Sequence, residues 1–132
     1  MTLGKTACAS APAATPQLER FHDFAHKQLM ACPPCEKGRC AWPDCSARFE
    51  PTSYRQIYCS TSCRKKDDAE HRRIGDLIAR PALLARTHKH AKAETPEKAL
   101  ASAARTFQDR TLSAWRISRN QRKAHAEAGR CI

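Results

Sequence analysis

The chain has 132 residues and a formal net charge of +11, with 24 Lys and Arg against 13 Asp and Glu. This length allows one small domain with helical extensions, and aromatic residues make up only 6% of the chain, which excludes a large hydrophobic core. No apolar run approaches the roughly 18 residues of a membrane span, so no membrane partner is expected.

Residues 1–14 are rich in Ala, Ser and Thr and are predicted to be disordered. They lack the continuous apolar segment of a secretion signal, so we expect the protein in the cytoplasm, or in the host cytoplasm if it is phage-encoded. Cysteines in that compartment are metal ligands more often than disulfides. A secreted disulfide framework is the alternative.

An amphipathic helix followed by a linker is predicted for residues 15–37. Thr15 and Pro16 combine an N-cap with a proline at the first helical position. Apolar residues at helical spacing then continue the helix for about 15 residues. Pro33 and Pro34 cannot continue it, so the helix should end before Cys32.

This segment also carries a candidate for a second metal site, formed by His22, His26, Cys32 and Cys35. The two histidines are spaced i, i+4 on one helical face, and two thiolates would complete a Cys2His2 set. In the alternative interpretation the histidines flank an apolar face and the cysteines are free. A thioredoxin-like role for the Cys-x-x-Cys fits less well, because no βαβ pattern surrounds it.

The most specific motif is C-x4-C-x13-C-x3-C, formed by Cys40, Cys45, Cys59 and Cys63. Two close pairs of thiolates across a loop can converge on a tetrahedral zinc ion. Four protein ligands leave no open position for a substrate, so the spacing predicts a structural zinc site. The alternative is a shifted ligand set, in which Cys32 or Cys35 replaces one member of the first pair.

A zinc-stabilised treble-clef finger is the fold predicted for residues 38–80, which makes the chain a small α+β protein flanked by α-helices. Residues 48–50 and 55–58 alternate in character as two strands of a β-hairpin would, with a turn between them. Ser60 is a suitable N-cap and places Cys63 in the first turn of a helix. That helix should end near Ala79, because Arg80 precedes Pro81.

The C-terminal region, residues 81–132, is predicted to be helical and basic. Thr95 and Pro96 repeat the helix-start signal and open a periodic segment over residues 96–127. Its residues divide between a basic face and an apolar face. The apolar face is expected to hold Leu100, Ala103, Ala104, Phe107, Ala114 and Trp115.

The excess positive charge lies after the cysteine motif. Residues 1–63 carry a net +2 and residues 64–132 a net +9, which indicates a polyanionic partner, with nucleic acid, and DNA first, as the leading candidate. A solvated helical tail is the alternative. The candidate contact residues are Arg64, Lys65, Lys66, Arg72, Arg73, Lys98, Arg105, Arg116, Arg119 and Lys123.

No catalytic constellation is apparent. The sequence lacks paired carboxylates, a nucleophile elbow and a phosphate-binding glycine loop. We therefore expect that the protein is not an enzyme and that it has no catalytic residues.

Within residues 40–80, the segments Cys-x4-Cys-Ser-Ala-Arg-Phe-Glu-Pro and Tyr-Cys-Ser-x-x-Cys-Arg resemble the N-terminal treble-clef finger of lambdoid-phage NinG (Rap) recombination proteins. In that family a charged helical stretch and an HNH-nuclease-like half follow the finger, and the family acts on branched DNA. The resemblance implies an accessory or regulatory protein of phage or plasmid type, acting in recombination or transcription. Residues 1–37 depart from the family pattern. The nuclease-like half is absent, so no catalytic role is carried over.

Three functions therefore follow from the sequence. The first is a zinc-finger protein that binds nucleic acid. The second is a zinc-stapled protein–protein interaction module, in which residues 96–127 dock on a partner or pair with a second copy. The third is a truncated NinG-like nuclease that lacks its catalytic half.

Overall fold

The computed structural model describes residues 18–130 and divides into two compact units, with the boundary between Pro34 and Cys35. The expected disorder of residues 1–14 and the expected helix start at Thr15 and Pro16 lie outside the described residues.

The first unit contains two short helices where one longer helix was predicted. Helix α1 spans Phe21–Phe24 and α2 spans His26–Ala31, with a break at Ala25. Neither helix has a side-chain N-cap, and so short a helix has few backbone bonds to offset its nucleation cost. The end before Cys32 was predicted correctly.

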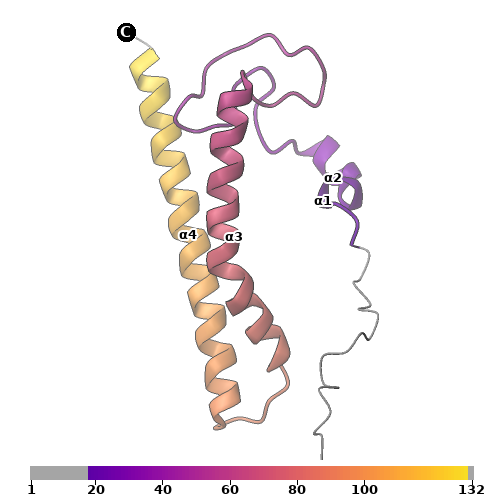
Figure 1. Ribbon diagram of the computed structural model, residues 1–132, viewed down its shortest axis with the longest axis vertical. Coiled ribbons are helices and arrows are strands. Elements are labelled where there is room, and N and C mark those ends of the chain that lie inside the picture. The colour runs from indigo at the N-terminus through magenta and orange to yellow at the C-terminus, as the bar shows by residue number, and fades with distance from the viewer. Residues whose placement is uncertain (1–17, 131–132) are drawn as a thin grey trace, which may run out of the picture. The chain divides into compact units, whose positions relative to one another are not determined.

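The second unit is a helical hairpin with a loop segment at one end (Figure 1). Helix α3 (Thr61–Thr87) leads away from the loop segment, residues 35–60, and α4 (Pro96–Arg130) returns antiparallel to α3. The C-terminal half of α4 contacts the loop segment, because Arg119 reaches Ala41 and Arg130 reaches Cys45. The hairpin therefore brings the end of the described chain back to the cysteine motif.

The prediction of an α+β treble clef is wrong, because the described residues are mostly helical and contain no sheet and no β-hairpin. Their one isolated β-bridge pairs Arg39 with Arg48, on either side of the first cysteine pair. Between Cys45 and Cys59, the Gln56 side chain takes the place of a strand ladder. Its Oε1 accepts from the Thr52 backbone N–H at 2.7 Å, and its Nε2 donates to the Tyr58 carbonyl at 3.0 Å.

Both long helices begin where the sequence predicted, but they run further. The Ser60 side chain accepts from the Cys63 N–H, and Thr95 Oγ1 accepts from the Lys98 N–H, each at 3.2 Å. Helix α3 continues through Pro81 to Thr87 instead of ending near Ala79. A proline inside a helix removes one backbone hydrogen bond, and α3 bends in its C-terminal half (Figure 1). Pro81 is half-buried, so packing within the hairpin favours continuing the helix.

The interior of the hairpin is small and largely polar. Ala101 and Ala104 are the buried residues of α4, and α3 contributes buried Asp67 and Glu70 beside the cysteine motif. The largest fully buried side chains in the described part are Asp67 and Ser46. Apolar burial contributes about 25 cal/mol per Å², and so little apolar area is buried that other forces must hold the two helices together.

The predicted apolar face of α4 is only partly its inner face. Ala104 is buried and Trp115 half-buried, whereas Leu100 and Phe107 are 43% and 44% exposed. Ala103 and Ala114 are also exposed. Steps of three and four residues separate the side chains that do face inward. They are Ala101, Ala104, Gln108, Thr111, Trp115, Ser118 and Arg122. The prediction equated hydrophobicity with burial, but this interface uses small and polar residues.

Candidate metal centre

The four cysteines of the motif come together at the base of α3. The sulfur atoms of Cys40, Cys45, Cys59 and Cys63 all lie within 4.8 Å of one another. Cys59 Sγ is 3.7 Å from both Cys45 Sγ and Cys63 Sγ. Four sulfurs at 2.3 Å from a tetrahedral zinc ion would be about 3.8 Å apart. The cluster can therefore hold a metal ion, and its spacing is compatible with zinc.

A tight turn positions the first cysteine pair. The backbone N–H groups of Cys45 and Ser46 both donate to the Trp42 carbonyl at 3.0 Å. Ser46 is fully buried at a positive φ of 49°, and its hydroxyl donates to the Pro43 carbonyl at 2.8 Å. The short polar side chain of Ser46 thereby supports a backbone conformation that few residues adopt. The turn brings Cys45 back beside Cys40.

The second pair is positioned by the start of α3. Cys59 precedes the N-cap and Cys63 lies in the first turn, where the positive end of the helix dipole favours thiolates. Two backbone contacts join the pairs. The Ala41 N–H donates to the Ile57 carbonyl at 2.8 Å, and the Cys59 N–H points at Cys40 Sγ at 3.4 Å.

The thiols of Cys40, Cys45 and Cys59 differ in the direction of their pKa shifts. Burial raises the pKa of Cys40 to about 12, although the Cys59 N–H favours its thiolate. Burial and the neighbouring thiols of Cys63 and Cys45 also raise the pKa of Cys59. At Cys45, burial is outweighed by the Ala47 backbone N–H and the adjacent thiols, so its pKa is lowered. Metal binding must therefore displace protons, and it releases them to solvent.

Beside the cysteines, two carboxylates of α3 meet two guanidinium groups of α4. Arg119 Nη1 lies 2.7 Å from Asp67 Oδ1 and 2.8 Å from Glu70 Oε2, and Arg122 Nη2 lies 2.9 Å from the same Glu70 oxygen. Hydrogen bonds from Arg122 lower the pKa of Glu70 despite its burial. Such charge-assisted bonds are among the stronger polar contacts in proteins. We call these four residues the interhelical ion network.

The ion network also holds the loop segment. Tyr58 Oη donates to Asp67 Oδ2 at 2.6 Å, and burial together with Asp67 raises the pKa of this phenol. Arg122 donates to Asp44 Oδ1 at 2.9 Å and lies 5.2 Å above the Trp42 ring. The loop segment, which carries Cys40, Cys45 and Cys59, therefore contacts both helices through the same charged groups.

The last turns of α4 reach the first cysteine pair directly. Arg130 Nε donates to the Cys45 carbonyl at 3.0 Å, and its Nη2 lies 3.8 Å from Cys45 Sγ. Arg39 donates to the Ser46 carbonyl at 2.9 Å and lies 3.6 Å from Glu127. A guanidinium beside a thiolate offsets part of the negative charge that four thiolates would place around one divalent ion.

The basic residues named from the sequence fall into two groups. Arg119 belongs to the ion network, and half-buried Lys98 donates to the Lys89 carbonyl at 3.1 Å. The other eight are exposed and form no ion pair within residues 18–130: Arg64, Lys65, Lys66, Arg72, Arg73, Arg105, Arg116 and Lys123. Their contact with nucleic acid stays a prediction.

Sequence reasoning missed Asp67, Glu70 and Arg122. The signal that could have found them is the equal spacing of opposite charges, since Asp67 and Glu70 are three residues apart and so are Arg119 and Arg122. Residues three apart on a helix share a face. Two helices that carry such pairs of opposite charge can therefore form ion pairs with each other, as α3 and α4 do here.

The second predicted metal site stays a prediction. His22 and His26 have ring centroids 6.2 Å apart in the first unit. Cys32 also belongs to that unit, whereas Cys35 opens the second. Within residues 18–130, the one group of His, Cys, Asp and Glu side chains close enough to share an ion is the set of four cysteines predicted first, without Cys32 or Cys35.

No protein-family model, characterised protein or solved structure matches this chain. In the described part, every helix is too short or too polar to cross a membrane.

Proposed function

We propose that this chain is a zinc-stabilised helical-hairpin protein that binds nucleic acid, DNA first, through the exposed basic side chains of α3 and α4. The sequence resemblance to NinG-type fingers adds an accessory or regulatory role in recombination or transcription of phage or plasmid type. The observation that carries the proposal is the group of eight exposed basic residues without ion pairs, held on a scaffold joined at the cysteine cluster.

Zinc is the metal that best suits the four sulfurs, because thiolate sets in tetrahedral arrangement favour it. The fold also needs such a cross-link. The buried hydrophobic residues of the described part are only Cys40, Cys63 and three alanines, whereas structural zinc contributes on the order of 10–16 kcal/mol in small domains. Zinc here would act on the fold and would supply no reaction chemistry.

The basic row of α4 has the length of a nucleic-acid site. Lys98 and Lys123 are 25 residues apart, which spans about 37 Å along a helix. One turn of B-DNA is about 35 Å long. Arg105 and Arg116 lie between them and are exposed. A row of this length suits an extended polyanion better than a small anion.

The test measures binding of the zinc-loaded chain to a labelled DNA duplex by fluorescence anisotropy at several salt concentrations. If about five side chains contact phosphates, log affinity should fall with log salt at a slope near −4.5. The double variant R105E/R116E should weaken binding strongly. R20E/R55E changes the net charge equally at exposed positions that belong to neither α3 nor α4, and it should keep most of the affinity. A slope near zero for the parent would contradict the proposal.

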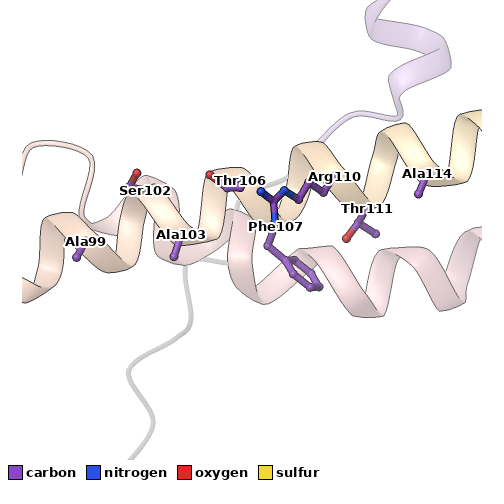
Figure 2. Close-up of a pocket in the computed structure, with 8 residues that line it drawn as sticks. All are labelled: Ala99, Ser102, Ala103, Thr106, Phe107, Arg110, Thr111 and Ala114. Atoms are coloured by element: carbon purple, nitrogen blue, oxygen red, sulfur yellow. The ribbon is translucent and has the colours of Figure 1, made fainter.

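One observation favours a second candidate, a protein-interaction module. A shallow hollow of about 800 Å³ lies along one side of α4, where Figure 2 shows its lining side chains following one another on the helix. Phe107 and Arg110 are the largest of them, and Leu100 is exposed nearby. The net charge of +11 opposes pairing of two copies. The occupant that fits is an amphipathic helix of another protein, with acidic side chains beside its apolar face.

The substitution F107A separates the two candidates. It should leave duplex binding intact and weaken capture of a designed acidic amphipathic peptide. R105E/R116E should show the opposite pattern, because it should weaken duplex binding more than it weakens capture of the peptide.

A further inference from the structure

A second basic feature lies between the C-terminal part of α3 and the N-terminal half of α4. A groove of about 280 Å³ there is lined by Ala82, Ala85, Arg86, Lys89 and Arg105. Arg86 and Lys89 were not among the basic residues expected to bind nucleic acid. The groove lies at the opposite end of the hairpin from the cysteines.

Three of its five lining residues are cationic and none is acidic. Arg86, Lys89 and Arg105 form no ion pair within residues 18–130. The ammonium group of Lys98 lies 3.1 Å from the Lys89 carbonyl and adds a fourth positive charge nearby. Like charges held around one groove repel one another. A bound anion would remove that cost.

The remaining lining residues suit a phosphate. Ala82 and Ala85 are half-buried and place only methyl groups at the groove, so they leave room for an anion between the charged side chains. Arg86 and Arg105 are exposed and come from different helices. Each guanidinium can bind two phosphate oxygens through paired N–H groups.

We propose that this groove anchors a phosphate of a nucleic-acid backbone and that the strand continues from it along the basic row of α4. The inference rests on the proposed function and names the place where binding is strongest. Arg105 belongs both to the groove and to the row that leads to Arg116 and Lys123. From Arg105 to Lys123 the row extends about 27 Å, so a free phosphate or a single lipid headgroup would occupy only its first part.

The test compares the full-length, zinc-loaded parent with R86Q/K89Q, which leaves every residue of the α4 row unchanged. Duplex binding is measured by fluorescence anisotropy over a salt series, after circular dichroism and zinc content show that both proteins are folded alike. Loss of the one anchored phosphate should make the salt slope about 0.9 shallower. The control R20Q/R55Q removes the same charge elsewhere and should leave the slope unchanged.

The outcomes separate the groove from the general proposal. If the parent binds DNA with a steep salt slope and R86Q/K89Q binds equally well with the same slope, the groove is not an anchor, while nucleic-acid binding stands. If the parent does not bind duplex or single-stranded DNA or RNA, both proposals fail. Binding of the parent to phosphatidylserine vesicles or inorganic phosphate but not to nucleic acid, with loss in R86Q/K89Q, would overturn the nucleic-acid assignment of the groove.

Discussion

The two ends of the helical hairpin are held by different forces. At the cysteine end, the interhelical ion network and Arg130 join the loop segment to both helices, beside four sulfurs that lie close enough to hold a metal ion. At the other end α4 buries Ala101 and Ala104, and the described residues form no ion pair between α3 and α4 there. The comparison indicates a fold that is joined by ion pairs around a possible metal site at one end and is only lightly packed at the other, where the cations of the groove gather.

The largest effect should come from a ligand cysteine. Replacing Cys63 by Ser removes the thiolate carried by α3 and should release the ion, with loss of most of the roughly 10 kcal/mol that structural zinc contributes. Zinc content and thermal melting followed by circular dichroism measure this. The matched control is Cys32→Ser, which alters an exposed cysteine outside the cluster. A C63S protein with full zinc content and parental melting would contradict the ligand assignment.

The ion network should rank second. Glu70→Gln keeps the size of the side chain but removes the charge shared by Arg119 and Arg122. We expect a loss of about 2 kcal/mol of unfolding free energy, below the value for a fully buried pair because both arginines retain some solvent contact. Asp76→Asn, at an exposed position of α3 without an ion pair in the described part, is the control and should change stability little. Urea unfolding in excess zinc measures both.

The same carboxylate predicts a pH dependence. Hydrogen bonds from Arg122 hold the pKa of Glu70 below its ordinary value of 4.5. The contribution of Glu70 to the free energy of unfolding is therefore complete at pH values above its pKa in the unfolded chain. It is lost as the pH falls through its lower pKa in the folded chain. The stability difference between the parent and E70Q should be constant above about pH 5 and shrink in more acidic solution. A stability difference between the parent and E70Q that grew on acidification would contradict a lowered pKa of Glu70 in the folded chain.

The smallest effect should come from the lightly packed end. Ala104→Gly lowers helix propensity and removes a buried methyl group, at a cost of about 1 kcal/mol. Hydrogen exchange of the amides near Ala104 should become faster, while zinc content and the amides of the first turn of α3 stay unchanged. Equal acceleration at both ends would mean that the hairpin opens as one unit, and the contrast between its ends would be lost.

How much the sequence revealed depended on the kind of signal. Cysteine spacing and the caps at Ser60 and Thr95 are local rules, and they located the cluster of four cysteines and the starts of both helices correctly. The β-hairpin failed because the Gln56 side chain satisfies backbone groups of the loop, which alternation alone cannot reveal.

The helix interface was harder to predict because its residues are polar. Asp67 and Glu70 lie in a charged segment of the sequence that is typical of a solvent-exposed helix surface. Arg119 was predicted to be one of the basic residues that contact nucleic acid. All three are instead contacts between helices that meet only in the folded chain. Leu100 and Phe107 were predicted to face inward because they are hydrophobic. Both are exposed, and the smaller Ala101 and Ala104 are buried in the interface instead.

The most direct test of the account is hydrogen exchange of the full chain before and after complete removal of zinc by a chelator. If an ion at the four cysteines holds this end of the hairpin, the loop segment, the first turns of α3 and the last turns of α4 should lose protection together, and added zinc should restore it. Unchanged protection of these three segments in the metal-free chain would contradict the claim that an ion at the four cysteines holds this end of the hairpin.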